Sequence, residues 1–369
     1  MENLKRIVVF FMLVFFMAAL VPLPAEAEEV LTIEEALAKA HKSNPDLRRV
    51  DLEVEKAQIM RDDAAEAVYY IPTGGLVYPE VQQVVNMYQQ AEIQLNALKK
   101  QQKAEKARIT KEVITAYADA VKKYNEAENL RVALKNAEEK LRISAIMREV
   151  GYISSFDYEQ TETGIKQLKE SYKAALRAYE GSVANLAALL GESQGWKPRL
   201  ASRAVLAEYP RHELSVEISR GLEESVMVWS KKALYDIEES KQNWILPNEK
   251  SEITRIKYEV AGIDYEKAKR DTRAVIENLY YTIDTLEGQI KAAETAYVQA
   301  EKAYNMAKIK YEAGIIPRIG TANDDLITAE ANMTKAKLDL ENLRLDLAKV
   351  KAEYAYLTGK EVYNSGDWN

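Results

Sequence analysis

Residues 326–357 read LITAEANMTKAKLDLENLRLDLAKVKAEYAYL, a stretch of strong helix formers without glycine or proline. Apolar or small residues recur along it at alternating steps of three and four, which is a seven-residue period. The stripe of an ordinary amphipathic surface helix would drift at 3.6 residues per turn, so the sustained period favours a left-handed coiled coil. The stripe comprises Leu326, Ala329, Met333, Ala336, Leu340, Leu343, Leu347, Val350, Tyr354 and Leu357.

The same register recurs 168 residues earlier, since 326 − 168 = 158. The earlier stripe comprises Tyr158, Thr161, Ile165, Leu168, Tyr172, Ala175, Tyr179, Ser182, Leu186 and Leu189. Two longer helical stretches, residues 80–150 and 251–313, precede these stripes and share a heptad pattern at an offset of 163 residues. Lys123 is the one polar residue that interrupts it. The sequence therefore contains an internal repeat of a long helix followed by a shorter one.

Helix start and stop signals divide each repeat further. Thr32 and Glu35 fit a capping box, and Asn44 is a good N-cap before Pro45. The predicted helices span residues 33–43, 45–68, 80–150, 154–190, 214–242 (with a bend at Gly221), 251–313 (interrupted at Gly262 and Gly288) and 324–357. In each half the shorter helices add up to about the length of the long one, so we expect them to stack end to end along it.

These patterns predict an all-α fold of two tandem repeats of long antiparallel coiled-coil helices, with no or minimal β-strand. The first repeat covers residues 28–191 and the second covers residues 213–360. A crossover linker, residues 192–212, joins them, and residues 361–369 form a C-terminal tail.

The N-terminus carries an export signal. Lys5 and Arg6 precede an apolar run over residues 7–21, and the small-residue triplet at residues 25–27 fits a cleavage site. We predict a signal peptide over residues 1–27. The alternative is a retained membrane anchor, but an apolar run of about 15 residues is short against the ~20 that a membrane span needs.

Composition argues against several classes of function. The chain has no cysteine, which excludes disulfides, thiol catalysis and cysteine-ligated metals. Only His41 and His212 offer imidazoles, and each stands alone. The net charge of −7 gives no basic surface for nucleic acid. No phosphate-binding, dinucleotide-binding or nucleophile motif occurs, so we predict no enzyme activity, no cofactor and no metal site.

One group of motifs resembles the TolC-like outer membrane efflux protein family. Residues 31–47 read LTIEEALAKAHKSNPDL, which is similar to the opening of that family. Each half then shows a long helix ending in glycine, a short turn, an aspartate and a helix closed by a second glycine. These residues are Gly151, Asp157 and Gly191 in the first half, and Gly314, Asp324, Asp325 and Gly359 in the second. The resemblance spans residues 31–360.

The resemblance implies a homotrimer whose helices form a hollow cylinder, supplied by an inner-membrane pump and a periplasmic adaptor. It also implies that the glycine turns form the tip of the cylinder. On that basis Gly151, Asp157, Gly314, Asp324 and Asp325 are candidates for a constriction. The alternative for the aspartates is stabilisation of a helix N-terminus by a carboxylate.

The sequence departs from the family between the short and long helices, where the family inserts a β-hairpin that contributes to a barrel. One membrane hairpin needs ~20 residues and a turn. Residues 69–79 and 243–249 are too short, so we predict no membrane-spanning barrel. The shortened positions include Tyr70, Pro72, Gly74, Gly75, Trp244 and Pro247. The apolar residues here are expected either to form a tip that touches a membrane surface or a partner, or to pack against one another.

Two functions remain. The first is a TolC-like component of an envelope efflux or export system, a helical duct that passes small solutes and docks a coiled-coil adaptor. The alternative is a non-transporting structural scaffold of the cell envelope. Both imply an exported chain, with the outer membrane suggested only by the resemblance, because fold likeness alone does not establish transport.

Overall fold

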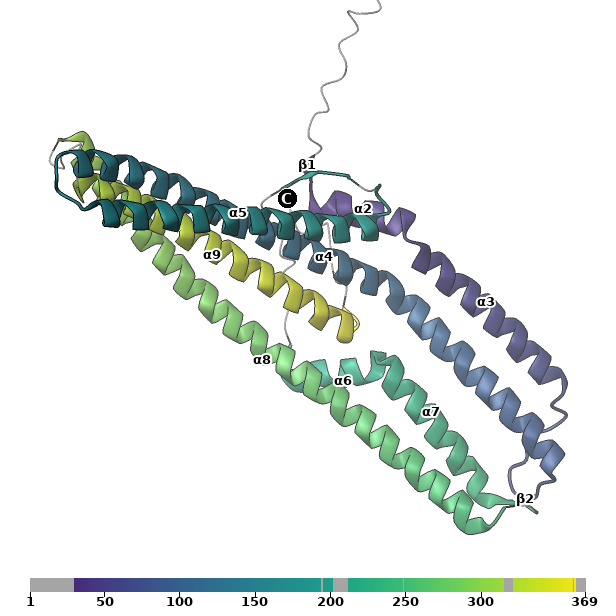
Figure 1. Ribbon diagram of the computed structural model, residues 1–369. Helices are drawn as coiled ribbons and strands as arrows, with labels where there is room; N and C mark the ends of the chain where they lie inside the picture. The colour runs from purple at the N-terminus through teal and green to yellow at the C-terminus, as the bar shows by residue number, and fades with distance from the viewer. Residues whose placement is uncertain are drawn as a thin grey trace, which may run out of the picture.

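The computed structural model describes residues 30–193, 195–201, 212–247, 249–314, 321–360 and 362, with the backbone alone for residues 321–324. The predicted signal peptide, most of the crossover linker and the tail from residue 363 lie outside these residues. Across the described part the chain folds into long helices, as predicted (Figure 1).

The first half contains α2 (Ile33–Ser43), α3 (Pro45–Glu66), α4 (Pro79–Glu149) and α5 (Ser155–Leu190). The second half contains α6 (Leu214–Glu224), α7 (Val226–Ser240), a short 3-10 turn (Lys241–Asn243), α8 (Ser251–Glu312) and α9 (Thr321–Leu357). Within the described residues, four two-residue strands accompany them: β1 (Val30–Leu31), β2 (Gly75–Leu76), β3 (Arg199–Leu200) and β4 (Trp244–Ile245).

Each long helix carries shorter helices stacked along it. The 71 residues of α4 span ~106 Å at 1.5 Å per residue. Helices α3 and α5 both pack on α4, while α6, α7 and α9 pack on α8. The two halves meet where α4 contacts α9 and α7, so the protomer is an elongated layer of helices (Figure 1). The predicted end-to-end stacking is confirmed.

Local signals place most helix ends as predicted. Thr32 and Glu35 form both hydrogen bonds of the capping box, and Asn44 accepts a hydrogen bond from the backbone N–H of Asp46. Gly151 and Gly191 adopt φ angles of +79° and +71°, a region that side chains with a Cβ disfavour. The last helix begins at residue 321, three residues before the predicted start.

The glycines inside helices behave differently from the prediction. The bend expected at Gly221 lies at Ser225, whose ψ of 116° ends α6 and whose hydroxyl caps α7 at the N–H of Val228. Gly221 instead lies against Ile276 of α8. Gly262 and Gly288 do not interrupt α8, which is continuous. Gly221 and Gly262, which lies against the ring of Tyr235, therefore mark close helix contacts rather than breaks, whereas Gly288 marks neither.

The predicted stripe of α9 is confirmed, but it is only half of what the helix buries. Leu347 and Tyr354 pack with Ile276 and Ile283 of α8. A second face, which the heptad stripe did not reveal, packs on α4. It comprises Leu345, Ala348, Ala352 and Ala355. This face is buried because α9 lies between α8 and α4. A heptad stripe indicates the face that packs on one neighbouring helix, here α8, and does not reveal the face that packs on a second.

The strands form two short parallel pairs, β1 with β3 and β2 with β4. The second pair joins residues 69–79 to residues 243–247, so the two short connections contact each other. Minimal strand content is confirmed for the described residues. None of the helices described is both long enough and apolar enough to cross a lipid bilayer.

Candidate functional site

The two glycine turns lie at one end of the protomer, and the β2–β4 pair lies at the other (Figure 1). We call these the turn end and the strand end. At the turn end, Gly314 has a φ of +70°, comparable to Gly151. Residues 315–320 lie outside the described part, as does the side chain of Asp324, while Asp325 is exposed on α9.

Asp157 is held by its own helix. Its carboxylate accepts hydrogen bonds from the backbone N–H of Ser154 at 3.3 Å and the Ser154 hydroxyl at 2.7 Å. Its backbone N–H donates to Ser154 Oγ at 3.1 Å. This reciprocal box stabilises the start of α5, as the alternative interpretation predicts. A role of Asp157 in a constriction stays a prediction.

The turn end also exposes apolar side chains that the sequence analysis did not single out. Tyr152 and Phe156 are 80% and 72% exposed, and Val150 is exposed beside them. Arg148 lies over the ring of Tyr158, with its guanidinium carbon 4.1 Å from the ring centroid. Val150, Tyr152 and Phe156 lie at or beside the turn and belong to no heptad stripe, so the sequence pattern did not predict their exposure.

The strand end divides its apolar residues between two sides. Val77, Trp244 and Leu246 are buried with Val85 of α4. The indole N–H of Trp244 donates to the carbonyl of Pro72 at 3.0 Å. Successive side chains of a strand point to opposite sides, so the intervening residues face outward. Packing of these residues against one another is therefore confirmed for Val77, Trp244 and Leu246, while contact of the exposed residues with a membrane surface or a partner stays a prediction.

The outward residues come from two segments, five of them from residues 69–78 and one from β4. They comprise Tyr69, Tyr70, Ile71, Leu76, Tyr78 and Ile245, all at least half exposed. We call these six residues the rim. Gly75 turns the chain with a φ of +83°, and Gly74 lies close to the carbonyl of Asn243. Pro247 is exposed next to the buried Leu246.

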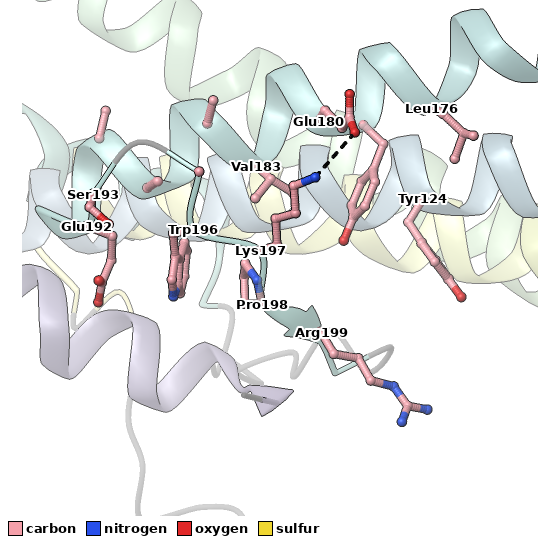
Figure 2. Close-up of a pocket in the computed structure, with 15 residues that line it drawn as sticks. Tyr124, Leu176, Glu180, Val183, Glu192, Ser193, Trp196, Lys197, Pro198 and Arg199 are labelled. Atoms are coloured by element: carbon pink, nitrogen blue, oxygen red, sulfur yellow. Dashed lines mark ion pairs between the residues drawn. The ribbon is translucent and has the colours of Figure 1, made fainter. Parts of the chain in front are cut away.

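A lateral cleft of about 820 Å³ lies beside α5 (Figure 2). Its wall comes from Tyr124 of α4, from α5 and from the segment after α5 that carries Trp196 and Pro198. Most of the accessible surface of the cleft is apolar, and three of its four charged residues lie in ion pairs. Lys197 lies 3.9 Å from Glu180, and Glu192 is paired with Lys39 of α2 at 2.9 Å. Such a cleft offers an apolar surface with no acid–base machinery.

The half-buried His41 of α2 and the buried Glu217 of α6 lie away from these features. Burial lowers the pKa of His41, and the positive charge of Lys106 lowers it further, against a smaller opposing effect of a hydrogen bond with the Lys106 backbone. Burial acts to raise the pKa of Glu217, but hydrogen bonds from Lys360 and from the His212 N–H outweigh it and hold this pKa below its usual range. Among the described residues, no group of three or more histidine or carboxylate side chains is arranged to hold a metal ion.

Comparison with solved structures places this architecture among channels. A membrane protein from Pseudomonas aeruginosa aligns with a TM-score of 0.66 at 13% identity, covering 91% of this chain and 92% of that one. The CmeC outer membrane channel of Campylobacter jejuni gives 0.63 at 14% identity, with 91% and 87% covered. The outer membrane protein VceC of Vibrio cholerae gives 0.61 at 14%, with 90% and 97% covered.

No protein-family model matches the sequence, and no curated protein matches it either. The structural likeness covers nine-tenths of the chain, so the whole architecture is shared rather than one hairpin. The chain therefore has a TolC-like fold, that of outer membrane efflux channels, as its sequence motifs suggested.

Proposed function

We propose that the protein is the channel component of an envelope efflux or export system, a homotrimeric helical duct that passes small solutes. The observation that carries this proposal is the shape of the helical layer. Contacts order its helices as α3, α4, α7 and α8 toward the strand end, and as α5, α4, α9 and α8 toward the turn end. One edge of the layer is therefore α8, and the other edge is α3 with α5.

A layer with two different edges favours head-to-tail association of identical copies, which closes into a ring when the rotation allows it. Both edges retain apolar side chains that the protomer leaves exposed. Ile253, Ile256, Val260 and Ile263 form a stripe on α8 with steps of three and four. Leu52 and Ile59 lie one heptad apart on α3. These stripes are suited to helix–helix packing between copies.

The ends of the duct have different proposed roles. At the turn end, the exposed Tyr152 and Phe156 beside the glycine turns provide aromatic anchors for a coiled-coil adaptor that connects to an inner-membrane pump. At the strand end, the rim holds the duct at an envelope membrane. The outer membrane channels among the solved structures support the envelope location.

Assembly is tested by native mass spectrometry together with cross-linking. The chain has no cysteine, so introduced cysteines report single positions. We expect a trimer, and we expect Ile59→Cys combined with Val260→Cys to give covalent trimers on oxidation. The matched pair Tyr152→Cys with Ile245→Cys joins opposite ends of the protomer and should not cross-link. A stable monomer at micromolar concentration would contradict the duct.

Transport is tested separately by deleting the gene and measuring dye or antibiotic efflux from the cells. A duct predicts reduced efflux, restored by the wild-type gene. A scaffold without transport, the alternative function, predicts unchanged efflux with altered envelope integrity.

A further inference from the structure

We propose that the rim docks on the surface of a neutral lipid bilayer by shallow insertion of its tyrosine and isoleucine side chains. The rim lies at the extreme end of a long rod (Figure 1). Tyr69 is 96% exposed, and the five other rim residues are between 50% and 63% exposed. Large apolar side chains gathered in this way mark an interaction site on a protein surface.

The rim is mounted on a fixed base. Val77 donates its backbone N–H to the carbonyl of Ile245 at 2.9 Å, which extends the β2–β4 pair by one residue. The buried ring of Trp244 packs with Val77 and Val85 and is hydrogen-bonded to Pro72. The outward side chains therefore need little further ordering when they bind, which lowers the entropic cost of docking.

The small size of the rim argues for lipid rather than protein. A stable protein interface uses roughly 20–30 residues on each side. The six rim residues fall well short of that number, so a second copy or another protein would gain too little from covering them. A lipid surface requires no matching shape and accepts a few amphipathic side chains.

The charge of the strand end fits a neutral bilayer. Residues 67–79 and 243–247 contain no Asp, Glu, Lys or Arg. Of the charges that flank the second segment, Lys241 is paired with Glu238 at 3.0 Å and Glu249 with Lys257 at 2.8 Å. The rim therefore enters the headgroup region without dehydrating an ion, and anionic lipids should add little attraction.

Tyrosine suits this depth because its ring is apolar and its hydroxyl stays hydrated. Glu66 and Glu80 flank residues 67–79 in the sequence, and these charges limit how deeply the segment inserts. The contact is therefore shallow, within the headgroup region. The inference deepens the proposed envelope location but does not require ring closure, because a single protomer presents the whole rim.

The test uses the full chain with one introduced cysteine. Thr73→Cys lies beside the rim and is labelled with an environment-sensitive fluorophore, while Ser155→Cys, at an exposed position of the turn end, is the positional control. With phosphatidylcholine vesicles that carry spin-labelled lipid, we expect strong quenching at position 73 and none at position 155. Replacing a third of the lipid with phosphatidylglycerol should change the affinity less than twofold.

Removing the rim should abolish the signal at position 73. We expect the combination of Tyr69→Ser, Tyr70→Ser and Ile245→Ser to weaken vesicle binding at least tenfold. The matched combination of Val298→Ser, Met306→Ser and Ile309→Ser changes exposed apolar residues of α8 outside the rim and should weaken it less than twofold. If the triple rim variant unfolds, Tyr69→Ser alone should weaken binding at least threefold.

Absent quenching at position 73, equal quenching at position 155, or binding only to anionic vesicles would each overturn the inference. Native mass spectrometry of the same samples reports the oligomer independently. Loss of the trimer with membrane contact retained therefore contradicts the duct, and the reverse result contradicts the docking.

Discussion

Lys122 of α4 donates to both carboxylate oxygens of Asp346 on α9, each at 2.9 Å, across 224 positions of the chain. Neighbouring pairs extend this contact into a ladder between the two repeats. Lys349 donates to Asp119 at 2.7 Å, Lys111 lies 2.9 Å from Glu353, and the buried Asn125 donates to Asn342 at 3.0 Å. A slip of about one helical turn would bring Lys122 toward Lys349, so the ladder sets the register of the repeats.

Charge reversal tests this register. We expect Asp346→Lys to destabilise the fold by about 1 kcal/mol, and the exchange of both charges, Lys122→Asp with Asp346→Lys, to recover most of the loss. Asp339→Lys is the control, because the exposed Asp339 pairs with Lys335 of its own helix. Urea denaturation measures all four proteins. Equal losses in the single and exchanged variants would show that the pair does not set the register.

The close contact between α6 and α8 requires a glycine at position 221, because a larger residue would not fit. A Cβ at residue 221 would lie 2.2 Å from Cδ1 of Ile276, which is fully buried. Gly221→Ala should therefore cost about 1–3 kcal/mol through overpacking, although alanine favours the helix. Ile276→Val removes the clashing carbon and should rescue the variant.

Gly288→Ala is the matched control, because it adds the same methyl group to a helix at a position with free space. No atom lies within 4 Å of a Cβ at that position, so we expect a gain of up to about 1 kcal/mol from helix propensity alone. Thermal unfolding separates the two outcomes. A stabilised Gly221→Ala variant would mean that α6 packs less closely than the structure indicates.

His41 makes stability depend on pH near neutrality. Its Nε2 lies 2.9 Å from Thr110 Oγ1, and its pKa is held below 6.5. The unfolded chain then binds more protons than the folded one, so stability should fall as the pH drops below about 6.5. We expect His41→Gln to reduce the loss of melting temperature between pH 7.5 and 5.5.

The ion pair of Glu217 and Lys360 joins α6 to the end of the second repeat. Its atoms lie 2.7 Å apart, and both side chains are buried. Removing one partner of such a pair costs about 3–5 kcal/mol, which is the expectation for Lys360→Met at pH 7. Glu217→Leu added to Lys360→Met should restore most of the stability.

The pH dependence of this pair has a definite sign. Because the pKa of Glu217 is depressed, its stabilising contribution is present above the ordinary value of 4.5 and is lost as the pH falls below it. The cost of Lys360→Met, measured by denaturation, should therefore shrink in acid. A cost that stays constant from pH 7 to pH 3.5 would mean that Glu217 carries no charge in the fold.

The sequence by itself determined the long helices, most of their ends and the heptad stripe of α9. Caps such as Thr32 with Glu35 and turns such as Gly151 depend on neighbours within a few residues, so the local pattern contains them. The resemblance of the motifs was also sufficient to indicate the TolC-like fold. The bend was predicted at Gly221 but lies at Ser225, because a helical glycine can mark either a break or a close contact.

Only the tertiary structure decided which side chains of each element have a neighbour. It placed the second face of α9 against α4, turned Val77 inward and Tyr78 outward, and formed the cleft at Trp196. Each of these depends on a segment distant in the chain, such as Trp244 packing with Val77. Local periodicity specifies a helix or a strand, but burial is a property of the packed chain.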